Sequence, residues 1–100
     1  MDFEFYRNFI TVAETGNLTT ASKKLALAQP ALSAQIKTLE HYYGAKLIQT
    51  ARGKRQLTLT EAGEAFLGKA RQICRTEETI LLDMQSFNKK ASGTLRFSVS

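Results

Sequence analysis

Residues 17–48 read NLTTASKKLALAQPALSAQIKTLEHYYGAKLI, and this stretch decides the fold. Its first helical pattern follows Asn17, whose short side chain suits the N-cap of a helix. A tight connection at residues 25–28 leads to Pro30, which opens a second helical pattern because no N–H is needed there. The apolar residues of this second pattern recur at helical spacing and predict one buried face, formed by Leu32, Ile36, Leu39 and Tyr43.

The residues on either side complete a three-helix unit with a hairpin. Phe5, Phe9 and Val12 form the apolar stripe of an earlier helix, and Gly16 suits its left-handed C-terminal position. Residues 47–59 place a basic, glycine-centred tip between two apolar runs, which indicates two short strands around a turn. We therefore predict a mainly α fold over residues 1–60: a winged helix-turn-helix made of three helices plus a β-hairpin wing.

A long helix is expected after the hairpin, over residues 61–88. Thr60 suits the N-cap of a capping box, although Gly63 stands where such a box has Glu or Gln. An apolar seam follows at alternating steps of four and three, interrupted by Glu77. So broad an apolar face implies a partner helix, most simply that of a second copy; the alternative is a helix that lies on its own domain. The predicted dimerisation residues are Phe66, Ala70, Ile73, Cys74, Ile80, Leu81, Met84 and Phe87.

Residues 89–100 differ from the helical pattern before them. Residues 89–93 read KKASG, which is typical of a linker, and residues 94–100 alternate apolar and polar side chains as a strand does. A single strand without a partner strand is not stable. We therefore expect a hinge and the first strand of a truncated further domain.

Positive charge is concentrated in the middle of the chain. The net charge is +5, and the window from Lys23 to Arg55 holds seven of the 14 Lys and Arg residues against a single acidic residue, Glu40. A basic middle between near-neutral flanks favours a polyanion-binding surface, although charge alone is equally compatible with a solvated face. The single cysteine, Cys74, and the lack of any long apolar run or signal peptide favour the cytoplasm and no membrane association.

The sequence does not assemble the parts of an enzyme. No paired carboxylates, nucleophile–base pair or glycine-rich phosphate loop can be found, so we expect no catalytic residues. His41 is the sole histidine and Cys74 lies 33 positions beyond it, so metal-ligand spacing is missing and no metal site is expected.

The chain closely resembles the DNA-binding region of LysR-type transcriptional regulators. The resemblance covers about residues 3–87, and its most specific parts are QPALS at residues 29–33 and LTEAG at residues 59–63. It implies double-stranded promoter or operator DNA as the partner, a homodimer or tetramer built through the long helix, and RNA polymerase as a further partner. It also implies no cofactor in this fragment, but a small-molecule inducer for the missing C-terminal domain.

The same resemblance implies roles for individual residues. Gln29 opens the third helix, where a glutamine side chain can bind adenine through N6 and N7. Two positions depart from the family: Ala28 lacks the usual hydroxyl, and Ala34 replaces a frequent arginine and leaves a methyl group that suits thymine. The hairpin also looks about two residues longer than the family form, which affects the contacts at its tip. The predicted DNA-binding residues are Thr20, Gln29, Pro30, Ser33, Ala34, Lys37, Arg52, Lys54 and Arg55.

Two alternatives compete with this interpretation. A helical protein-interaction module would explain the long apolar seam, but it leaves the basic window and the basic hairpin without a role. Within the DNA-binding class, a winged-helix regulator with a different sensor domain, such as the molybdate-responsive type, is the nearest rival. The sequence of the downstream domain would distinguish the two regulators.

Overall fold

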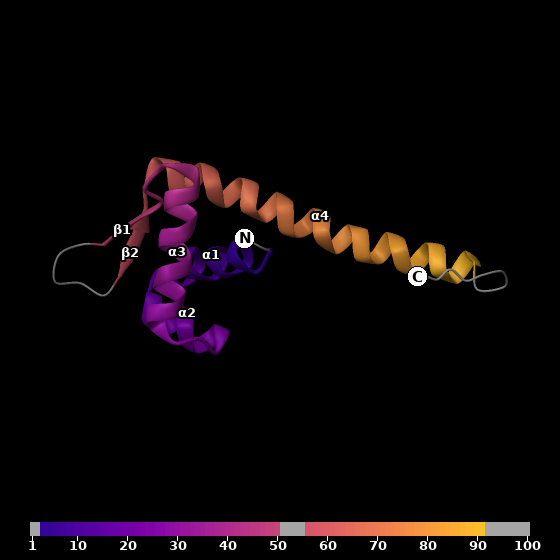
Figure 1. The fold of residues 1–100 in the computed structure, drawn as a ribbon, viewed down its shortest axis with the longest axis horizontal. Helices are drawn as coiled ribbons and strands as arrows, with labels where there is room; N and C mark the ends of the chain where they lie inside the picture. Colours follow the sequence, from indigo (N-terminus) through magenta and orange to yellow (C-terminus); the bar gives the residue numbers. More distant parts are fainter. Residues whose placement is uncertain (1–2, 51–55, 92–100) are drawn as a thin grey trace.

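A computed structural model describes residues 3–50 and 56–91 of the 100-residue chain. Three helices are followed by an antiparallel hairpin and one long helix, which confirms the predicted fold class. Figure 1 shows α4 extending away from the three shorter helices, with the hairpin on the opposite side of the molecule. The elements are α1 (Phe3–Thr15), α2 (Leu18–Leu25), α3 (Gln29–Tyr43), β1 (Ile48–Thr50), β2 (Leu57–Leu59) and α4 (Glu61–Ala91).

The short helices begin and end where the sequence predicted. Gly16 has a φ of 66° just beyond α1, and the Asn17 side chain accepts a 2.9 Å hydrogen bond from the Thr20 N–H at the start of α2. Pro30 lies in the first turn of α3, and Gly44 ends this helix with a φ of 67°. The turn between α2 and α3 contains a left-handed residue that is not glycine, Ala26, with a φ of 56°. The Ala26 N–H donates a hydrogen bond to a carbonyl group in the last turn of α2. This contact fixes the direction in which the chain continues into α3.

One apolar core holds the three helices and the hairpin together. The buried faces of the three helices meet there, as the periodicity predicted, and Leu47 and Leu57 join them from the hairpin. Asn8 of α1, which is also buried, donates a 2.7 Å hydrogen bond to the Gln35 side chain of α3. The largest fully buried side chains are Phe9, Val12, Leu32, Ile36, Leu39 and Leu47.

The hairpin is joined to the helices at both of its strands. β1 pairs with β2 in antiparallel register, with Ile48 opposite Leu59. On the β2 side, the Leu57 N–H donates to the Gly16 carbonyl at 2.9 Å, and Gln56 forms an isolated bridge with Asn17. The base of the wing is therefore fixed beside the start of α2, a link that hydrophobic periodicity did not reveal.

The start of α4 explains the departure from the capping-box pattern. Thr60 caps the helix as predicted, because its Oγ1 accepts a 2.9 Å hydrogen bond from the Gly63 N–H. A Cβ at residue 63 would lie 2.9 Å from the carbonyl carbon of Leu47 and closer still to its oxygen. Only glycine allows this close approach of helix and hairpin, so a Glu side chain at this position is excluded by packing.

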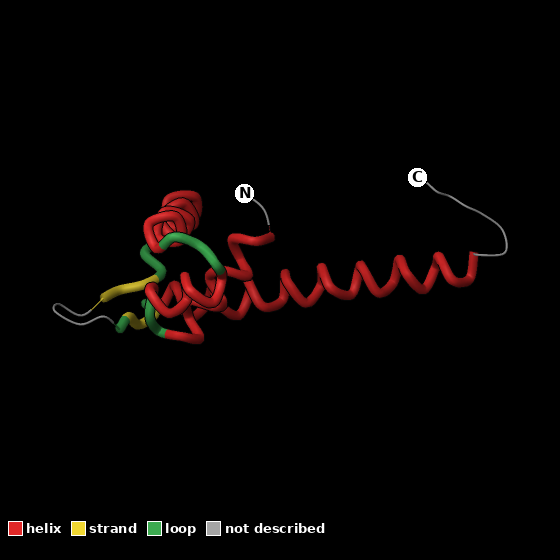
Figure 2. Tube along the Cα trace, turned by 90° about the horizontal axis from the view of Figure 1, so that it is seen from below, coloured by secondary structure: helices red, strands yellow, loops and turns green. Residues whose placement is uncertain are grey.

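The long helix continues to Ala91, three residues beyond the predicted end at residue 88. Residues 89–91 are thus helical and do not form the predicted hinge, while the predicted strand over residues 94–100 lies outside the described residues. Figure 2 shows the same extension of the helix from a second direction. Among the described residues, no helix combines the length and apolar character that crossing a membrane requires.

Candidate nucleic-acid interface

One side of α3 is buried and the opposite side is exposed, so the helix presents a polar face to solvent. Leu32, Ile36 and Leu39 are buried, whereas Pro30 and Lys37 are exposed. Gln29 lies at the N-terminal end of this helix and is exposed as well. The structure brings five predicted DNA-binding residues together at the N-terminal half of α3: Gln29, Pro30, Ser33, Ala34 and Lys37.

The N-terminus of α3 carries no side-chain cap. Ala28 occupies the N-cap position in an extended conformation, and no side-chain hydrogen bond satisfies the first amides of the helix. These amides carry the positive end of the helix dipole, which favours an anion. Thr20 is exposed in the first turn of the neighbouring helix α2. Lys23 and Lys24 are exposed in its last turn and extend the positive charge.

The wing is described at its base but not at its tip. The predicted contact residues Arg52, Lys54 and Arg55 lie outside the described residues. At the base, the Glu40 carboxylate of α3 accepts hydrogen bonds from the N–H groups of Leu47 at 2.9 Å and Ile48 at 3.3 Å. This carboxylate holds β1 beside α3, a role that a sequence reading based on apolar spacing did not assign to it.

The first half of α4 packs on its own monomer, which corrects part of the predicted dimer seam. The Phe66 ring meets Phe9 edge to face, with ring centroids 4.9 Å apart. Ala70 and Cys74 are buried without any second copy. Within the monomer, α1 already covers this part of the seam, so the burial of Phe66, Ala70 and Cys74 is explained without the predicted dimer partner. The alternative that the helix lies on its own domain holds for these residues.

Two ion pairs connect the same helices at their exposed margins. Arg7 of α1 lies 3.3 Å from the Glu77 carboxylate of α4, and Arg71 of α4 lies 3.3 Å from Glu14 of α1. Glu77, which interrupts the apolar seam in the sequence, thus has a partner within the monomer. Burial raises the pKa of the Cys74 thiol, so this side chain is a small apolar group rather than a reactive thiolate.

An aromatic contact ties the C-terminal end of α3 to the same assembly. The Tyr43 hydroxyl lies 2.6 Å from the Tyr6 hydroxyl of α1, and the Tyr43 ring packs against Phe66. The hydrogen bond with Tyr6, together with partial burial, raises the pKa of Tyr43 to about 12. Tyr43 therefore packs on α1, but it is 45% exposed, so the prediction that it belongs to the buried face of α3 is wrong: it lies at the edge of the core. Tyr42 instead contacts the Tyr43 ring and is mostly exposed.

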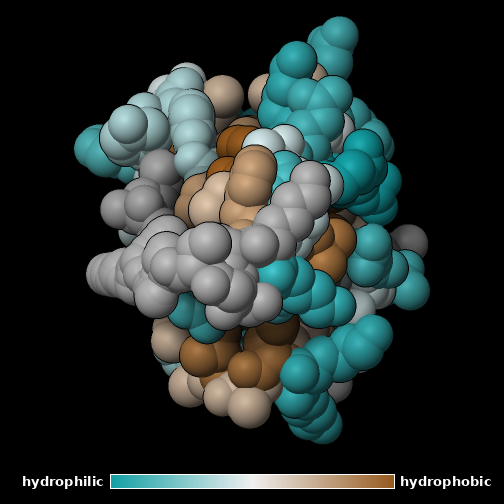
Figure 3. Space-filling model, turned by 90° about the vertical axis from the view of Figure 1, so that its right-hand side faces the viewer, coloured by the Kyte–Doolittle hydropathy of each residue, from teal (hydrophilic) through white to brown (hydrophobic). Residues whose placement is uncertain are grey.

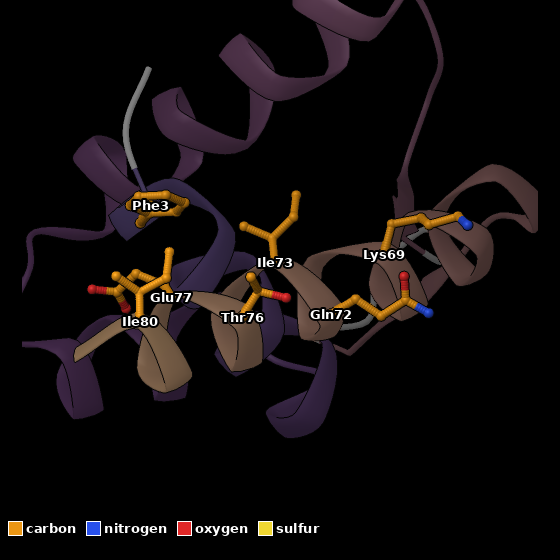
Figure 4. A pocket seen from close by; sticks show the side chains of 7 residues that line it. All are labelled: Phe3, Lys69, Gln72, Ile73, Thr76, Glu77 and Ile80. Atoms are coloured by element: carbon orange, nitrogen blue, oxygen red, sulfur yellow. The ribbon is translucent and has the colours of Figure 1, made fainter. Parts of the chain in front are cut away.

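The second half of α4 exposes its apolar side chains. Viewed from the end toward which α4 extends, apolar surface lies between hydrophilic side chains (Figure 3). Where α1 begins, a groove of about 440 Å³ opens beside Phe3, Ile73 and Ile80. Figure 4 shows Phe3 above Glu77 and Ile80, with Ile73 pointing into the same space. The exposed fractions of the remaining seam residues are 51% for Ile80, 55% for Leu81, 51% for Met84 and 62% for Phe87.

The described residues offer no alternative site for metal chemistry. Within residues 3–50 and 56–91, no three His, Cys, Asp or Glu side chains gather where they could hold a metal ion. The surface features that remain are the polar face of α3, the basic residues around it and the apolar end of α4.

Comparison with known proteins places this arrangement among bacterial regulators. Residues 3–64 match the family model described as bacterial regulatory helix-turn-helix protein, lysR family. The HTH-type transcriptional regulator BsdA of Bacillus subtilis (strain 168) is 40% identical over 95 residues, which cover 95% of this chain and 32% of the relative. The Hca operon transcriptional activator HcaR of Escherichia coli (strain K12) is 42% identical over 82 residues, which cover 82% and 27% respectively. The chain thus spans about a third of the length of these two relatives.

Solved structures show the same fold. The crystal structure of the BenM_DBD/benA site 1 DNA complex matches with a TM-score of 0.79 and 31% identity, covering 87% of this chain and 99% of that chain. The CbnR_DBD–DNA complex matches with a TM-score of 0.72 and 34% identity, covering 93% and 99% respectively. Full-length BenM matches with a TM-score of 0.76 and 32% identity, covering 85% of this chain but 27% of that chain.

Proposed function

The chain belongs to the lysR family of bacterial regulatory helix-turn-helix proteins, and on this premise we propose that it is the DNA-binding part of a sequence-specific transcriptional regulator. The observation that carries the proposal is the exposed polar face of α3, in a fold whose solved neighbours include complexes with DNA. A helix of this kind enters the major groove with its N-terminal residues at the base edges. The family is one of regulators, and we assign no enzymatic activity to this chain.

The N-terminal half of α3 contacts the edges of the DNA bases. Gln29 binds adenine through N6 and N7, and the Ala34 methyl group contacts the methyl group of thymine. Ser33 and Lys37 lie on the same side of the helix and serve base or phosphate oxygens. Pro30 shapes the first turn, while Thr20 of α2 contacts the phosphate backbone. The uncapped start of α3 supports this orientation, because unpaired amides suit a phosphate or a base acceptor.

Backbone binding is shared between the body of the domain and the wing. The wing residues Arg52, Lys54 and Arg55 contact phosphate or reach into the minor groove. The hydrogen bonds that Glu40 accepts from the N–H groups of Leu47 and Ile48 support this placement, because they fix the base of the wing beside α3. Each phosphate neutralised by a cation releases counterions, so binding becomes strongly dependent on salt concentration.

A homodimer, or a tetramer of such dimers, places two copies of α3 on one operator. The exposed apolar residues of α4, namely Ile80, Leu81, Met84 and Phe87, support this assembly, since each of them is more than half exposed in the monomer. Ile73 is half-buried and contributes from the groove beside Phe3. Dimers of helix-turn-helix proteins bind two half-sites that lie about one turn of DNA apart.

The rest of the regulator lies beyond this chain. The curated relatives are about three times as long, which supports a C-terminal domain that binds a small-molecule inducer. We further propose cytoplasmic location and an encounter with RNA polymerase at the promoter. We also propose domain boundaries at residues 60 and 91, which the end of the hairpin and the end of α4 support.

Selection of DNA sequences provides the direct test. The 100-residue chain is incubated with a pool of random duplexes, bound duplexes are amplified over several rounds, and the enriched sequence is footprinted. We expect an interrupted, partly palindromic sequence to emerge, and binding to weaken with salt at a slope of roughly −0.9 per phosphate contact. A pool that stays random, together with a salt slope near zero, would leave a protein-interaction module as the better interpretation.

A further inference from the structure

A second cleft, between α3 and β1, is lined by Ser33 and Lys37 of the proposed DNA-binding surface and by residues that have no role in the function proposed so far. Its volume is about 440 Å³, and it opens beside the exposed face of α3. Leu18, Ile36 and Ile48 supply apolar surface to it. Polar and charged side chains complete the lining: Ser33, Lys37, Glu40, Lys46, Gln49 and Thr50.

The charges around this cleft suit an anion. Lys37 comes from α3 and Lys46 from the segment that leads into β1, so two exposed cations border the same space. Among the described residues of the lining, Glu40 is the single acidic side chain. Its carboxylate already accepts hydrogen bonds from the N–H groups of Leu47 and Ile48, which offset its negative charge. The two lysines therefore give the cleft a net positive charge.

The cleft is built on a firmly held backbone. The Lys46 carbonyl accepts a hydrogen bond from the Thr60 hydroxyl, and the next carbonyl, that of Leu47, accepts one from the Thr60 N–H at 3.0 Å. The same segment is held from the other side by Glu40. Since none of these bonds uses the Lys46 ammonium group, this cation is carried by a fixed main chain and is free to meet a ligand.

The position of the cleft defines what it would meet on DNA. If α3 occupies the major groove and the wing reaches the adjacent minor groove, the strand that separates the two grooves must cross the space between α3 and β1. We propose that this cleft seats the sugar–phosphate backbone of that strand, with Lys46 as a phosphate contact beside Lys37. The inference rests on the proposed function and adds Lys46, Gln49 and Thr50 to the DNA-binding surface.

Both the polar and the apolar residues of the lining match a sugar–phosphate backbone. A phosphodiester offers anionic oxygens, for which the lysine ammonium groups and the Ser33 and Thr50 hydroxyls are suitable donors. The neighbouring deoxyribose offers an apolar face, which matches the surface supplied by Leu18 and Ile48. A contact of this kind positions the protein on DNA without reading its sequence.

The test replaces Lys46 and follows the salt dependence of binding. Lys46→Ala is compared with Lys69→Ala, which removes the same charge from an exposed residue of α4 on the groove beside Phe3. We expect Lys46→Ala to reduce the slope of log K against log salt by about 0.9 per copy and to weaken enriched and random duplexes equally. Lys46→Arg should restore the slope, and Lys69→Ala should leave it unchanged.

A chemical change in the DNA locates the contact. Single neutral methylphosphonates are placed along the strand between the footprints of α3 and the wing. One of them should weaken binding of the wild-type chain but not that of Lys46→Ala, because the interaction it removes is already absent. An unchanged salt slope in Lys46→Ala, or additive losses at every methylphosphonate position, would overturn the cleft proposal. Failure of the wild-type chain to bind any duplex would instead overturn the proposed function itself.

Discussion

Replacing Ile80 by aspartate tests whether the exposed end of α4 organises DNA recognition. Full burial of a large apolar side chain contributes roughly 1.5–3 kcal/mol. Ile80 and Met84 are each 51% exposed in the monomer, so a partner helix gains about 1 kcal/mol from covering each of them. Ile80→Asp removes that contribution in both copies. It also places two unpaired carboxylates in the seam, each carrying a desolvation penalty of several kcal/mol.

The sum exceeds about 5 kcal/mol, which corresponds to a rise of more than a thousandfold in the dimer dissociation constant. The fold of the monomer should persist, because Ile80 lies beyond the part of α4 that is buried on α1. We therefore expect a folded monomer. Its affinity for a two-half-site duplex should fall toward that for a single half-site, because joint engagement of the half-sites is lost.

Sedimentation equilibrium and a gel-shift assay on the same preparation measure both effects. Ser86→Asp is the matched control: it adds the same charge in the same exposed stretch of α4, but about 120° round the helix from Ile80 and away from the seam. This control should remain dimeric and bind as the wild type does. The reasoning is refuted if Ile80→Asp stays dimeric, or if it is monomeric and still binds the two-half-site duplex at wild-type strength.

Three further predictions concern base reading and the joints of the fold. Gln29→Ala should weaken binding to the enriched duplex by roughly 1–3 kcal/mol and leave random duplex binding nearly unchanged, whereas Arg55→Ala should weaken both alike; fluorescence anisotropy on both duplexes distinguishes them. Gly63→Ala should lower the free energy of unfolding by about 1–3 kcal/mol in denaturant titration, because its Cβ meets the Leu47 carbonyl, while Gly68→Ala, with open space around it, should be neutral or stabilising. Asn17→Ala should lower it by about 1 kcal/mol through loss of the α2 cap, and equal stability of this variant and the wild type would contradict the capping role.

Local signals in the sequence were sufficient for the boundaries of the short helices and for the buried residues Leu32, Ile36 and Leu39 of α3. Gly16, Asn17, Pro30 and Gly44 each act through their own backbone conformation or a side chain that bonds a few residues away, so their positions can be predicted without a structure. The exposed face of α3 could also be predicted without a structure, because it lies opposite the apolar stripe. Its predicted contacts with DNA remain predictions.

Contacts between elements distant in the sequence could not be predicted in this way. The repeat in α4 marks an apolar stripe, but it does not say whether α1 or a second copy covers each turn. For this reason the sequence did not show that Phe66 and Ala70 are covered within the monomer. Glu40 and Gly63 were missed because their roles depend on the hairpin: one accepts hydrogen bonds from the start of β1, and the other allows α4 to touch Leu47.

The packing of α1 on α4 connects the recognition helix with the dimer seam. The ion pairs at its margins, Arg7 with Glu77 and Arg71 with Glu14, are largely exposed and contribute little to stability. The buried contacts around Phe66 therefore determine the direction in which α4 leaves the domain. Tyr43, at the end of α3, is part of the same aromatic cluster, so the recognition helix and α4 share one packed joint. In a dimer joined near Ile80, this packed joint would set the position of each α3. The spacing of the two half-sites therefore depends on packing within the monomer as well as on the dimer contact.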